Sequence, residues 1–317
     1  MAEAVPDEIT RLGCSGTRVI SHRAALPQSE GNPAMPPPGS IAAVTALMSR
    51  GVCSFDVDCF LTRDSVLVVG HPFELKHRLQ LEATPDTLTL DELHRAEAQL
   101  GIERSANVPE FLKAAVELAP TSGICDRFRP RGNEAKDTEA GPRASAGTSK
   151  LRHREQQQQQ QQERGTALRL FIEPKGTAMS VESVHMIAAA ARVAGAKANE
   201  VGLWVNDPQL ADTARATGIL TPVLAVKTTV SIPSLPSSET WAAVGPPVDF
   251  PEDVSHATGY PSLDAYGRAA RERGQILLTW VVDSKQDLLN ALRASAEGVI
   301  TNEPFYISSL LRDICGD

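Results

Sequence analysis

The stretch FDVDCFLTRDSVLVVGHP, residues 55–72, predicts two strands joined by a tight turn. In its first half Asp56 and Asp58 alternate with apolar residues, which places both carboxylates on one face of a strand. The segment RDS is typical of a turn, and VLVV is a second short apolar strand that ends at Gly70 and His71. A hairpin carrying two carboxylates and a histidine therefore lies at the centre of the sequence pattern.

On both sides of this hairpin, strand-sized apolar runs alternate with helical patterns. Parallel strands separated by helices of ten or more residues form right-handed βαβ units, and eight such units close into a barrel. The predicted fold class is α/β, a single (β/α)8 TIM barrel with a small hairpin insertion after the second strand. The strands are expected at 17–21, 52–59, 168–173, 201–205, 222–226, near 244–250, 276–282 and 298–301, with 66–69 in the hairpin. The helices are expected at 40–50, 90–100, 109–118, 180–193, 208–216, 262–273 and 286–293.

Length alone allows one large barrel or two smaller domains, because the chain has 317 residues and is 42% hydrophobic. Residues 126–164 decide between them. They include seven consecutive glutamines, Gln156 to Gln162, and contain almost no large apolar residue. Such a segment cannot bury enough surface to offset its ordering entropy, so we expect a disordered low-complexity insertion before the third barrel strand. The expected organisation is an N-terminal extension at 1–16 and one barrel at 17–314.

Composition excludes several classes of protein. No apolar run approaches the roughly 20 residues of a transmembrane helix, and the net charge of −8 does not suggest a nucleic-acid-binding protein. The five cysteines are scattered without metal-binding spacing, which indicates reduced thiols. The acidic start of the chain is not a secretory signal, so a cytoplasmic location is expected.

The predicted strand ends carry a set of chemically active side chains. Catalytic residues of (β/α)8 barrels lie at the carboxyl ends of the strands, so we expect these side chains to share one rim. They are His22 and Arg23, Asp56 and Asp58, His71, Glu173 and Lys175, and Trp280.

The types of residue in this set favour one chemistry. Three carboxylates suit a hard cation such as Mg²⁺ or Ca²⁺, and two histidines suit proton transfer near neutral pH. An arginine and a lysine supply positive charge for a phosphate. Together they indicate metal-assisted hydrolysis of a phosphodiester.

The motifs and their order resemble those of the glycerophosphodiester phosphodiesterase family. The resemblance implies that this chain is a divergent member of that family. The run at 55–72 is similar to the family pattern Glu-x-Asp, Thr-Lys-Asp-Gly and Val-Val-x-His-Asp without a gap. Further similarities cover LTLDEL at 88–93, VPEFL at 108–112, IEPK at 172–175, TWVVD at 279–283 and GVITNEP at 298–304.

The resemblance implies a metal-dependent barrel enzyme that hydrolyses glycerophosphodiesters to glycerol 3-phosphate and an alcohol. It implies that His22 and His71 are the acid–base pair and that Trp280 packs against the glycerol. The divalent cation, Mg²⁺ or Ca²⁺, would be held by Asp56, Asp58 and Glu173, and the phosphate by Arg23 and Lys175.

This chain also departs from the family pattern. Ala24 replaces a glycine, and Asp56 is one methylene shorter than the family's glutamate. Pro72 replaces an aspartate, and an acidic residue is missing near Pro38 unless Glu30 replaces it.

Two alternatives stay open. One is a lysophospholipase D-type activity on lysophospholipids, with an apolar lip at 72–75 or 232–235. The other is a barrel that binds a phosphate-containing lipid or metabolite with little or no turnover. In each case the expected partner is a small molecule, without nucleic acid, and the sequence demands no protein partner.

Overall fold

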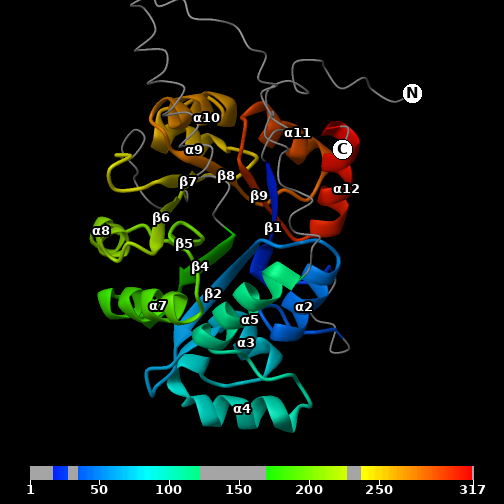
Figure 1. Ribbon diagram of the computed structural model, residues 1–317, viewed down its shortest axis with the longest axis vertical. Coiled ribbons are helices and arrows are strands. Elements are labelled where there is room, and N and C mark those ends of the chain that lie inside the picture. The colour runs from blue at the N-terminus through cyan, green and yellow to red at the C-terminus, as the bar shows by residue number, and fades with distance from the viewer. Residues whose placement is uncertain (1–16, 28–34, 122–168, 227–236, 316–317) are drawn as a thin grey trace, which may run out of the picture.

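The chain folds around a closed barrel of parallel strands (Figure 1). The computed structural model describes residues 17–27, 35–121, 169–226 and 237–315. Eight parallel strands follow one another in the order β1-β9-β8-β7-β6-β5-β4-β2, and pairing of β1 with β2 closes the ring. The predicted (β/α)8 fold is confirmed. The strands are β1 (Arg18–Ser21), β2 (Phe55–Leu61), β3 (Leu67–Val69), β4 (Leu170–Pro174), β5 (Val201–Trp204), β6 (Leu220–Ala225), β7 (Ala243–Gly245), β8 (Ile276–Thr279) and β9 (Gly298–Thr301).

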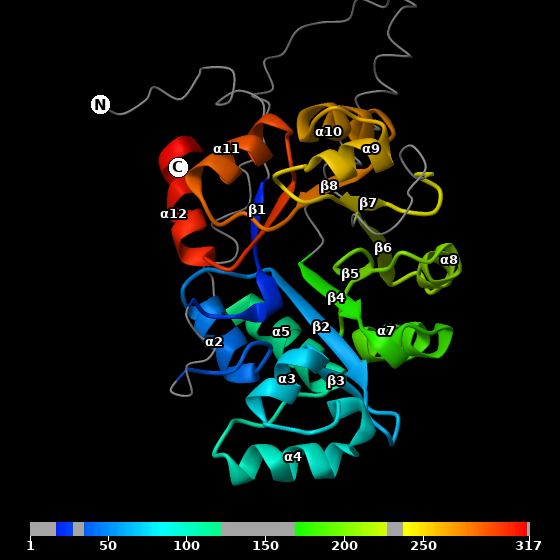
Figure 2. The same cartoon turned by 180° about the vertical axis from the view of Figure 1, so that it is seen from behind.

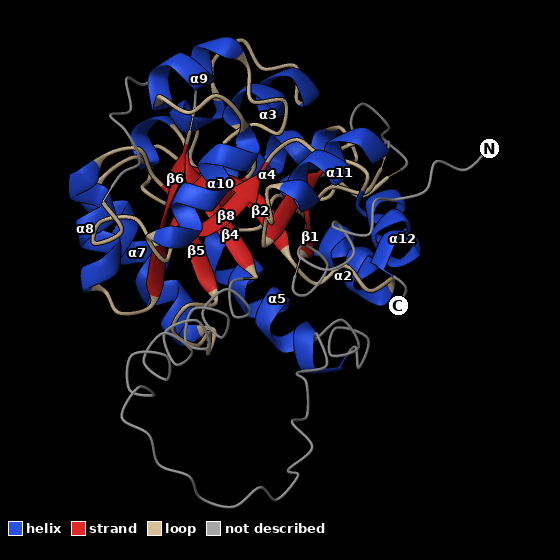
Figure 3. Ribbon diagram, turned by 90° about the horizontal axis from the view of Figure 1, so that it is seen from above, coloured by secondary structure: helices blue, strands red, loops and turns tan. Residues whose placement is uncertain are grey.

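Helices surround these strands, as the view from behind and the view from above show (Figures 2 and 3). The α-helices are α2 (Ile41–Ser49), α3 (Pro72–Arg78), α4 (Leu90–Gln99), α5 (Val108–Thr121), α7 (Val181–Val193), α8 (Pro208–Ala216), α9 (Glu252–Thr258), α10 (Leu263–Glu272), α11 (Lys285–Arg293) and α12 (Pro304–Cys315). The 3₁₀ helices are η1 (His22–Ala24), η2 (Pro85–Thr87) and η4 (Gly176–Ala178). The predicted extension at 1–16 and insertion at 126–164 lie outside the described residues.

Side-chain caps fix where many of these helices begin. An oxygen at the N-cap accepts a hydrogen bond from a backbone N–H of the first turn, which otherwise has no partner inside the helix. This sequence supplies the oxygen before α2, α4, α7, α8, α10 and α11, from Ser40, Thr89, Ser180, Asp207, Ser262 and Ser284.

The predicted hairpin is present, because β3 pairs antiparallel with β2 and places Cys59 opposite Val69. The sequence pattern missed the helix that follows, α3, which begins with Pro72 at its first position. Proline suits that position because its fixed φ is helical and its missing N–H needs no partner there. Helix α3 therefore starts directly after His71 and stands beside the barrel rim.

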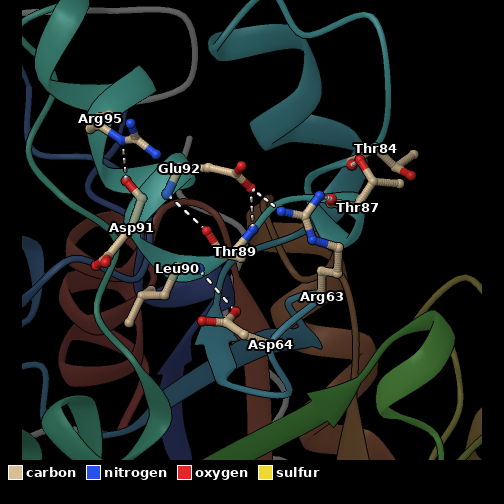
Figure 4. A network of polar contacts seen from close by, with 9 residues as sticks. All are labelled: Arg63, Asp64, Thr84, Thr87, Thr89, Leu90, Asp91, Glu92 and Arg95. Atoms are coloured by element: carbon tan, nitrogen blue, oxygen red, sulfur yellow. Dashed lines mark hydrogen bonds and ion pairs between the residues drawn. The ribbon is translucent and has the colours of Figure 1, made fainter.

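Two of the motifs that carry the family resemblance pin this hairpin to α4 (Figure 4). The side chain of Arg63 donates to Glu92 Oε2 at 2.8 Å, and Asp64 Oδ1 accepts from the Leu90 N–H at 3.0 Å. Thr89 and Glu92 form a reciprocal capping box at the start of α4. These motif residues thus build the scaffold on which α3 and His71 rest.

The barrel interior is filled by every second residue of the strands. Ile20, Phe171, Trp204 and Ile300 belong to one buried apolar cluster inside the barrel. A Cβ atom on Gly245 would lie 2.5 Å from the Trp204 ring, so only glycine leaves room for this indole. Residues two positions further along each strand must then face the carboxyl end of the same interior.

Two of the described cysteines are oxidised. Cys53 and Cys315 are disulfide-bonded, whereas Cys59 is a buried free thiol whose pKa is raised by burial. The prediction of reduced thiols is therefore wrong for Cys53 and Cys315. Among the described residues, no helix is long and apolar enough to span a bilayer.

Candidate active site at the barrel rim

The three predicted carboxylates come together where the first half of β2 runs beside the carboxyl-terminal half of β4. Phe55 and Val57 pack in the core outside the barrel. Because side chains alternate along a strand, Asp56 and Asp58 face the barrel interior. Strand pairing places Asp58 directly opposite Glu173. Asp56 and Asp58 are each 7% exposed, so their negative charges are held close together in a poorly solvated place.

Lys175 lies between two of these carboxylates. Its Nζ is 2.7 Å from Glu173 Oε1 and 3.0 Å from Asp58 Oδ1. Burial lowers the pKa of Lys175, but the charges of Asp58 and Glu173 outweigh it, so the pKa is raised overall. Lys175 therefore stays an ammonium ion and offsets part of the negative charge at the rim.

Asp56 is in a different environment. Its Oδ1 accepts a hydrogen bond of 2.9 Å from the Trp204 indole N–H. Burial, followed by the charges of Asp58 and Glu173, raises the pKa of Asp56 well above its usual range, against the smaller opposing effects of Lys175 and Trp204. The cause is physical crowding of like charges in a poorly solvated site, which an additional cation would relieve.

Arg23 lies beside Asp58, in the short helix η1 where the chain turns sharply. Arg23 has φ 57° and Ala24 has φ 46°, a left-handed conformation that explains why a glycine is common at such a place. The Arg23 Nε is 3.6 Å from Asp58 Oδ2, and its Nη1 forms an ion pair with Glu74 of α3. Glu74 is a site residue that the sequence pattern did not predict.

His71 is placed by the hairpin. The Gly70 N–H donates to the Asp58 backbone carbonyl at 2.8 Å, and His71 is the N-cap residue of α3. Burial lowers the pKa of His71, while the charge of Asp58 acts in the opposite direction. Within the described part of the chain, its buried Nδ1 has no hydrogen-bond partner.

His22 is held by a chain of hydrogen bonds from the last two barrel strands. Its Nδ1 lies 2.8 Å from Asn302 Oδ1, and the Asn302 Nδ2 donates to Asp283 Oδ2 at 2.7 Å. Asp283 Oδ1 also accepts from the Asn302 N–H and the Thr301 hydroxyl, each at 2.8 Å. Neither Asn302 nor Asp283 was among the predicted site residues, although Asn302 stands two positions after interior-facing Ile300.

Trp280 closes the other side of the barrel interior. It packs against the interior cluster, and its indole N–H donates to the Gly245 carbonyl at 2.7 Å. Its ring can therefore contribute apolar surface to a ligand, while its N–H is engaged by the barrel itself. The predicted contact with glycerol stays a prediction.

A cavity of about 740 Å³ opens beside this rim. Arg23, Asp58 and His71 form part of its wall, so the cavity is continuous with the charged cluster. The remaining wall comes from the loop before α2, from β2, from the end of β3, from α3 and from the loop after α4: Met35, Pro36, Pro37, Pro38, Gly39, Val57, Val69, Gly70, Phe73, Glu74, Leu75, His77, Arg78, Gly101, Ile102 and Glu103.

The donor set fits a hard divalent cation. Asp56, Asp58 and Glu173 provide only carboxylate oxygens, the ligands that Mg²⁺ and Ca²⁺ prefer, and burial, followed by their mutual repulsion, raises the pKa of Asp56. In the part of the chain that the structure describes, no three His, Cys, Asp or Glu side chains surround one point as metal ligands do. Lys175 instead bridges Asp58 and Glu173, so the predicted metal site stays a prediction.

Comparison with known proteins identifies the fold. No protein-family model and no curated protein matches the sequence. The structure is similar to a glycerophosphodiester phosphodiesterase from Parabacteroides distasonis, with 14% identity and a TM-score of 0.57 over 95% of this chain and 99% of that chain. It is similar to an Oleispira antarctica phosphodiesterase in complex with the product sn-glycerol-3-phosphate, with 14% identity and a TM-score of 0.57 over 93% and 96%. It is also similar to a glycerophosphodiester phosphodiesterase from Thermotoga maritima, with 15% identity and a TM-score of 0.55 over 93% of this chain and 98% of that chain. This chain thus has the barrel that these enzymes have.

Proposed function

We propose that this protein is a phosphoric diester hydrolase that converts glycerophosphodiesters to glycerol 3-phosphate and an alcohol. The observation that carries the proposal is the position of Asp58, which contacts Arg23 and Lys175 and shares a cavity wall with His71. A phosphate group entering this rim meets two cations and a histidine at once. The similarity of the fold to glycerophosphodiester phosphodiesterases supports the same reaction.

The two histidines divide the proton transfers. Because Asn302 accepts a hydrogen bond from the Nδ1 of His22, a neutral His22 ring has its lone pair on Nε2 and acts as the base that takes a proton from water. The water oxygen bonds to phosphorus and the bond from phosphorus to the alcohol oxygen breaks. His71 gives a proton to that departing oxygen; burial lowers the pKa of His71, and the charge of Asp58 beside it acts in the opposite direction. One water molecule is consumed: its hydroxyl goes to phosphorus and its other proton to His22, while the alcohol takes the proton of His71. The cycle closes when His22 releases one proton to solvent and His71 takes one up.

Arg23 and Lys175 hold the phosphoryl oxygens. Both lie beside carboxylates that restrict their movement. Cations fixed in this way stabilise negative charge that grows on the phosphoryl group without having to reorganise. Trp280 supplies apolar surface for the glycerol carbons.

We further propose that the enzyme is metal-dependent, with Mg²⁺ or Ca²⁺ held by Asp56, Asp58 and Glu173. Such an ion polarises phosphoryl oxygens as a Lewis acid when it is bound. The support is the donor set itself and the like-charge repulsion that raises the pKa of Asp56. Its test is turnover in excess chelator, followed by addition of Mg²⁺ or Ca²⁺; activity that is indifferent to chelator rejects the metal.

A substrate panel tests the reaction. Glycerophosphocholine, glycerophosphoethanolamine, glycerophosphoinositol and 1-acyl lysophospholipids are incubated with each metal, and glycerol 3-phosphate or lysophosphatidic acid is measured. We expect glycerol 3-phosphate to appear, and His22→Ala and His71→Ala to reduce its rate at least 100-fold. His185→Ala is the matched control, because His185 is exposed on α7.

The panel also separates the alternatives. Turnover of lysophospholipids alone would replace the proposed substrate by the lysophospholipase D-type one. Binding of these compounds without turnover of any of them would favour a binding barrel. Full activity of either histidine variant would reject the acid–base assignment.

A further inference from the structure

The cavity beside His71 has no role in the reaction as described so far. It shares Arg23, Asp58 and His71 with the rim and continues away from the barrel axis between α3 and the loop before α2. We propose that it holds the departing alcohol of the diester, and that this alcohol carries a large apolar body such as an alkyl chain. This inference rests on the proposed function and names its substrate class.

The position of the cavity assigns it to the departing alcohol. In the barrel, β1, β9 and β8 are neighbours, so His22, Asn302 and Trp280 stand together on one side of the rim. The hairpin and α3, which carry His71, stand on the other side of β1, next to β2. A diester whose glycerol lies against Trp280 and whose phosphate lies at Arg23 must therefore direct its second ester group toward His71 and the cavity.

The character of the wall indicates an apolar occupant. Met35, Pro36, Phe73 and Ile102 come from three separate segments, and all of them keep part of their surface exposed at this cavity. Phe73 is 62% exposed although it stands in the first turn of α3, directly after the proposed catalytic His71 and its neighbour Pro72. Large apolar side chains left exposed around a concave site usually mark the place where an apolar ligand binds.

The two arginines of the wall each lie near a carboxylate of the protein. Arg23 pairs with Glu74 and Asp58, and Arg78 lies 3.9 Å from the fully buried Glu97. Each of the two guanidinium groups is thus balanced by a carboxylate. A charged head group in this part of the cavity would have to compete with the pair of Arg78 and Glu97, whereas an alkyl chain gains by covering the apolar wall.

The test is a series of glycerol phosphate diesters of ethanol, butanol and octanol. Burial of one CH₂ contributes about 0.8 kcal/mol, so partial burial of a chain of this length is expected to raise kcat/KM at least tenfold from ethyl to octyl. Affinity is measured in parallel by calorimetry on His71→Ala, in which the octyl diester should bind more tightly than the ethyl diester. This second measurement does not depend on turnover.

Two matched variants place the effect in the cavity. Phe73→Ser removes an exposed ring from the wall, and Leu100→Ser removes an exposed side chain of the same region, 46% exposed, that does not line the cavity. We expect Phe73→Ser to lower the octyl-to-ethyl ratio at least threefold, in kcat/KM and in affinity, and Leu100→Ser to leave it unchanged. Melting temperatures confirm that both variants are folded.

The outcomes separate the two proposals. The cavity assignment is overturned if turnover does not depend on the length of the alcohol. It is also overturned if Phe73→Ser leaves the octyl-to-ethyl ratio unchanged. In both cases the proposed function stands. A preference for a chain on the glycerol instead of the alcohol also overturns it. If no diester is hydrolysed, the proposed function fails. The octyl-to-ethyl ratio of affinities, measured on His71→Ala and on the double variant with Phe73→Ser, then still decides whether the cavity takes an alkyl chain.

Discussion

The Nδ1 of His22 lies 2.8 Å from the Oδ1 of Asn302, and the orientation of that amide is fixed from behind. Asp283 accepts hydrogen bonds only, and the Asn302 Nδ2 donates to it at 2.7 Å. With the amide turned the other way, two oxygens would face each other at that distance. Oδ1 must therefore point at His22, and His22 must donate from Nδ1. Asn302, which directly follows β9, thus sets the tautomer of a proposed catalytic histidine.

Exchange of the two partners tests this role. Asn302→Asp places two carboxylates side by side, so we expect kcat/KM to fall at least tenfold. The double variant Asp283→Asn with Asn302→Asp can keep all of these hydrogen bonds, with donor and acceptor exchanged only between the two side chains, and should recover most of that loss.

The double variant should also move the acid limb of the pH–rate profile to higher pH. Its carboxylate faces His22 and favours the protonated ring, which cannot act as the base. Thermal melts serve as the control for folding. A double variant that recovers stability but neither recovers activity nor shifts the profile would contradict the positioning role.

Lys175 offers a second test, because it is the cation between Asp58 and Glu173. Replacement by methionine leaves these carboxylates facing each other without a positive charge. We expect kcat/KM for glycerophosphocholine to fall at least tenfold and the melting temperature to decrease. Addition of Mg²⁺ or Ca²⁺ should then raise the melting temperature of Lys175→Met more than that of the wild type, since the ion relieves a larger repulsion.

Lys113→Met is the matched control, because Lys113 is 66% exposed on α5 and pairs with Glu117 on the same helix. It should behave as the wild type does. Equal activity of Lys175→Met and Lys113→Met would remove Lys175 from the site.

The barrel could be predicted from the sequence because each strand is a short apolar run followed by a helical pattern. Even the weakest run, near 244–250, corresponds to a strand, the three-residue β7. The period of two along the strands also brings Asp56, Asp58 and Glu173 together, as predicted, because parallel strands in register end at one rim.

The parts of the site that were missed come from contacts without a local pattern. Helix α3 has seven residues and begins with proline, too short for a helical period, so Glu74 and its ion pair with Arg23 were not foreseen. The hydrogen bond from Trp204 to Asp56 joins residues 148 positions apart and depends on the room left by Gly245. The position of Asn302 could have been predicted, because it stands two residues after Ile300, whose side chain faces the barrel interior.

The network in Figure 4 is predicted to be structural and not catalytic. Thr89→Ala removes the hydroxyl that accepts from the Glu92 N–H, and loss of an N-cap of this kind costs about 1 kcal/mol. We therefore expect a lower free energy of unfolding in urea and unchanged kcat. Thr89→Ser keeps the oxygen and should retain most of the stability. A large loss of kcat in Thr89→Ala at a temperature where it is fully folded would show that α4 controls the position of His71.

A carboxyl group at the opposite end of the barrel predicts how stability depends on pH. Glu297 precedes β9, and its Oε2 accepts from the Leu277 N–H at 2.8 Å. Burial raises the pKa of Glu297 to about 7, against smaller opposing effects of its hydrogen bonds and of Arg271. The folded state therefore holds this proton more tightly than the unfolded state does. The stabilisation is complete below the unfolded pKa of about 4.5, is lost as the pH rises from 4.5 to 7, and changes no further above that.

Glu297→Gln should remove this dependence, because the amide oxygen accepts from Leu277 and stays neutral at every pH. We expect the variant and the wild type to have similar free energies of unfolding in urea at pH 4.5. At pH 8 the variant should be more stable, by on the order of 2–3 kcal/mol. Glu272→Gln, on the exposed end of α10, is the control and should follow the wild type. Parallel stability curves for Glu297→Gln and Glu272→Gln between pH 4.5 and 8 would show that Glu297 is already ionised in the folded protein.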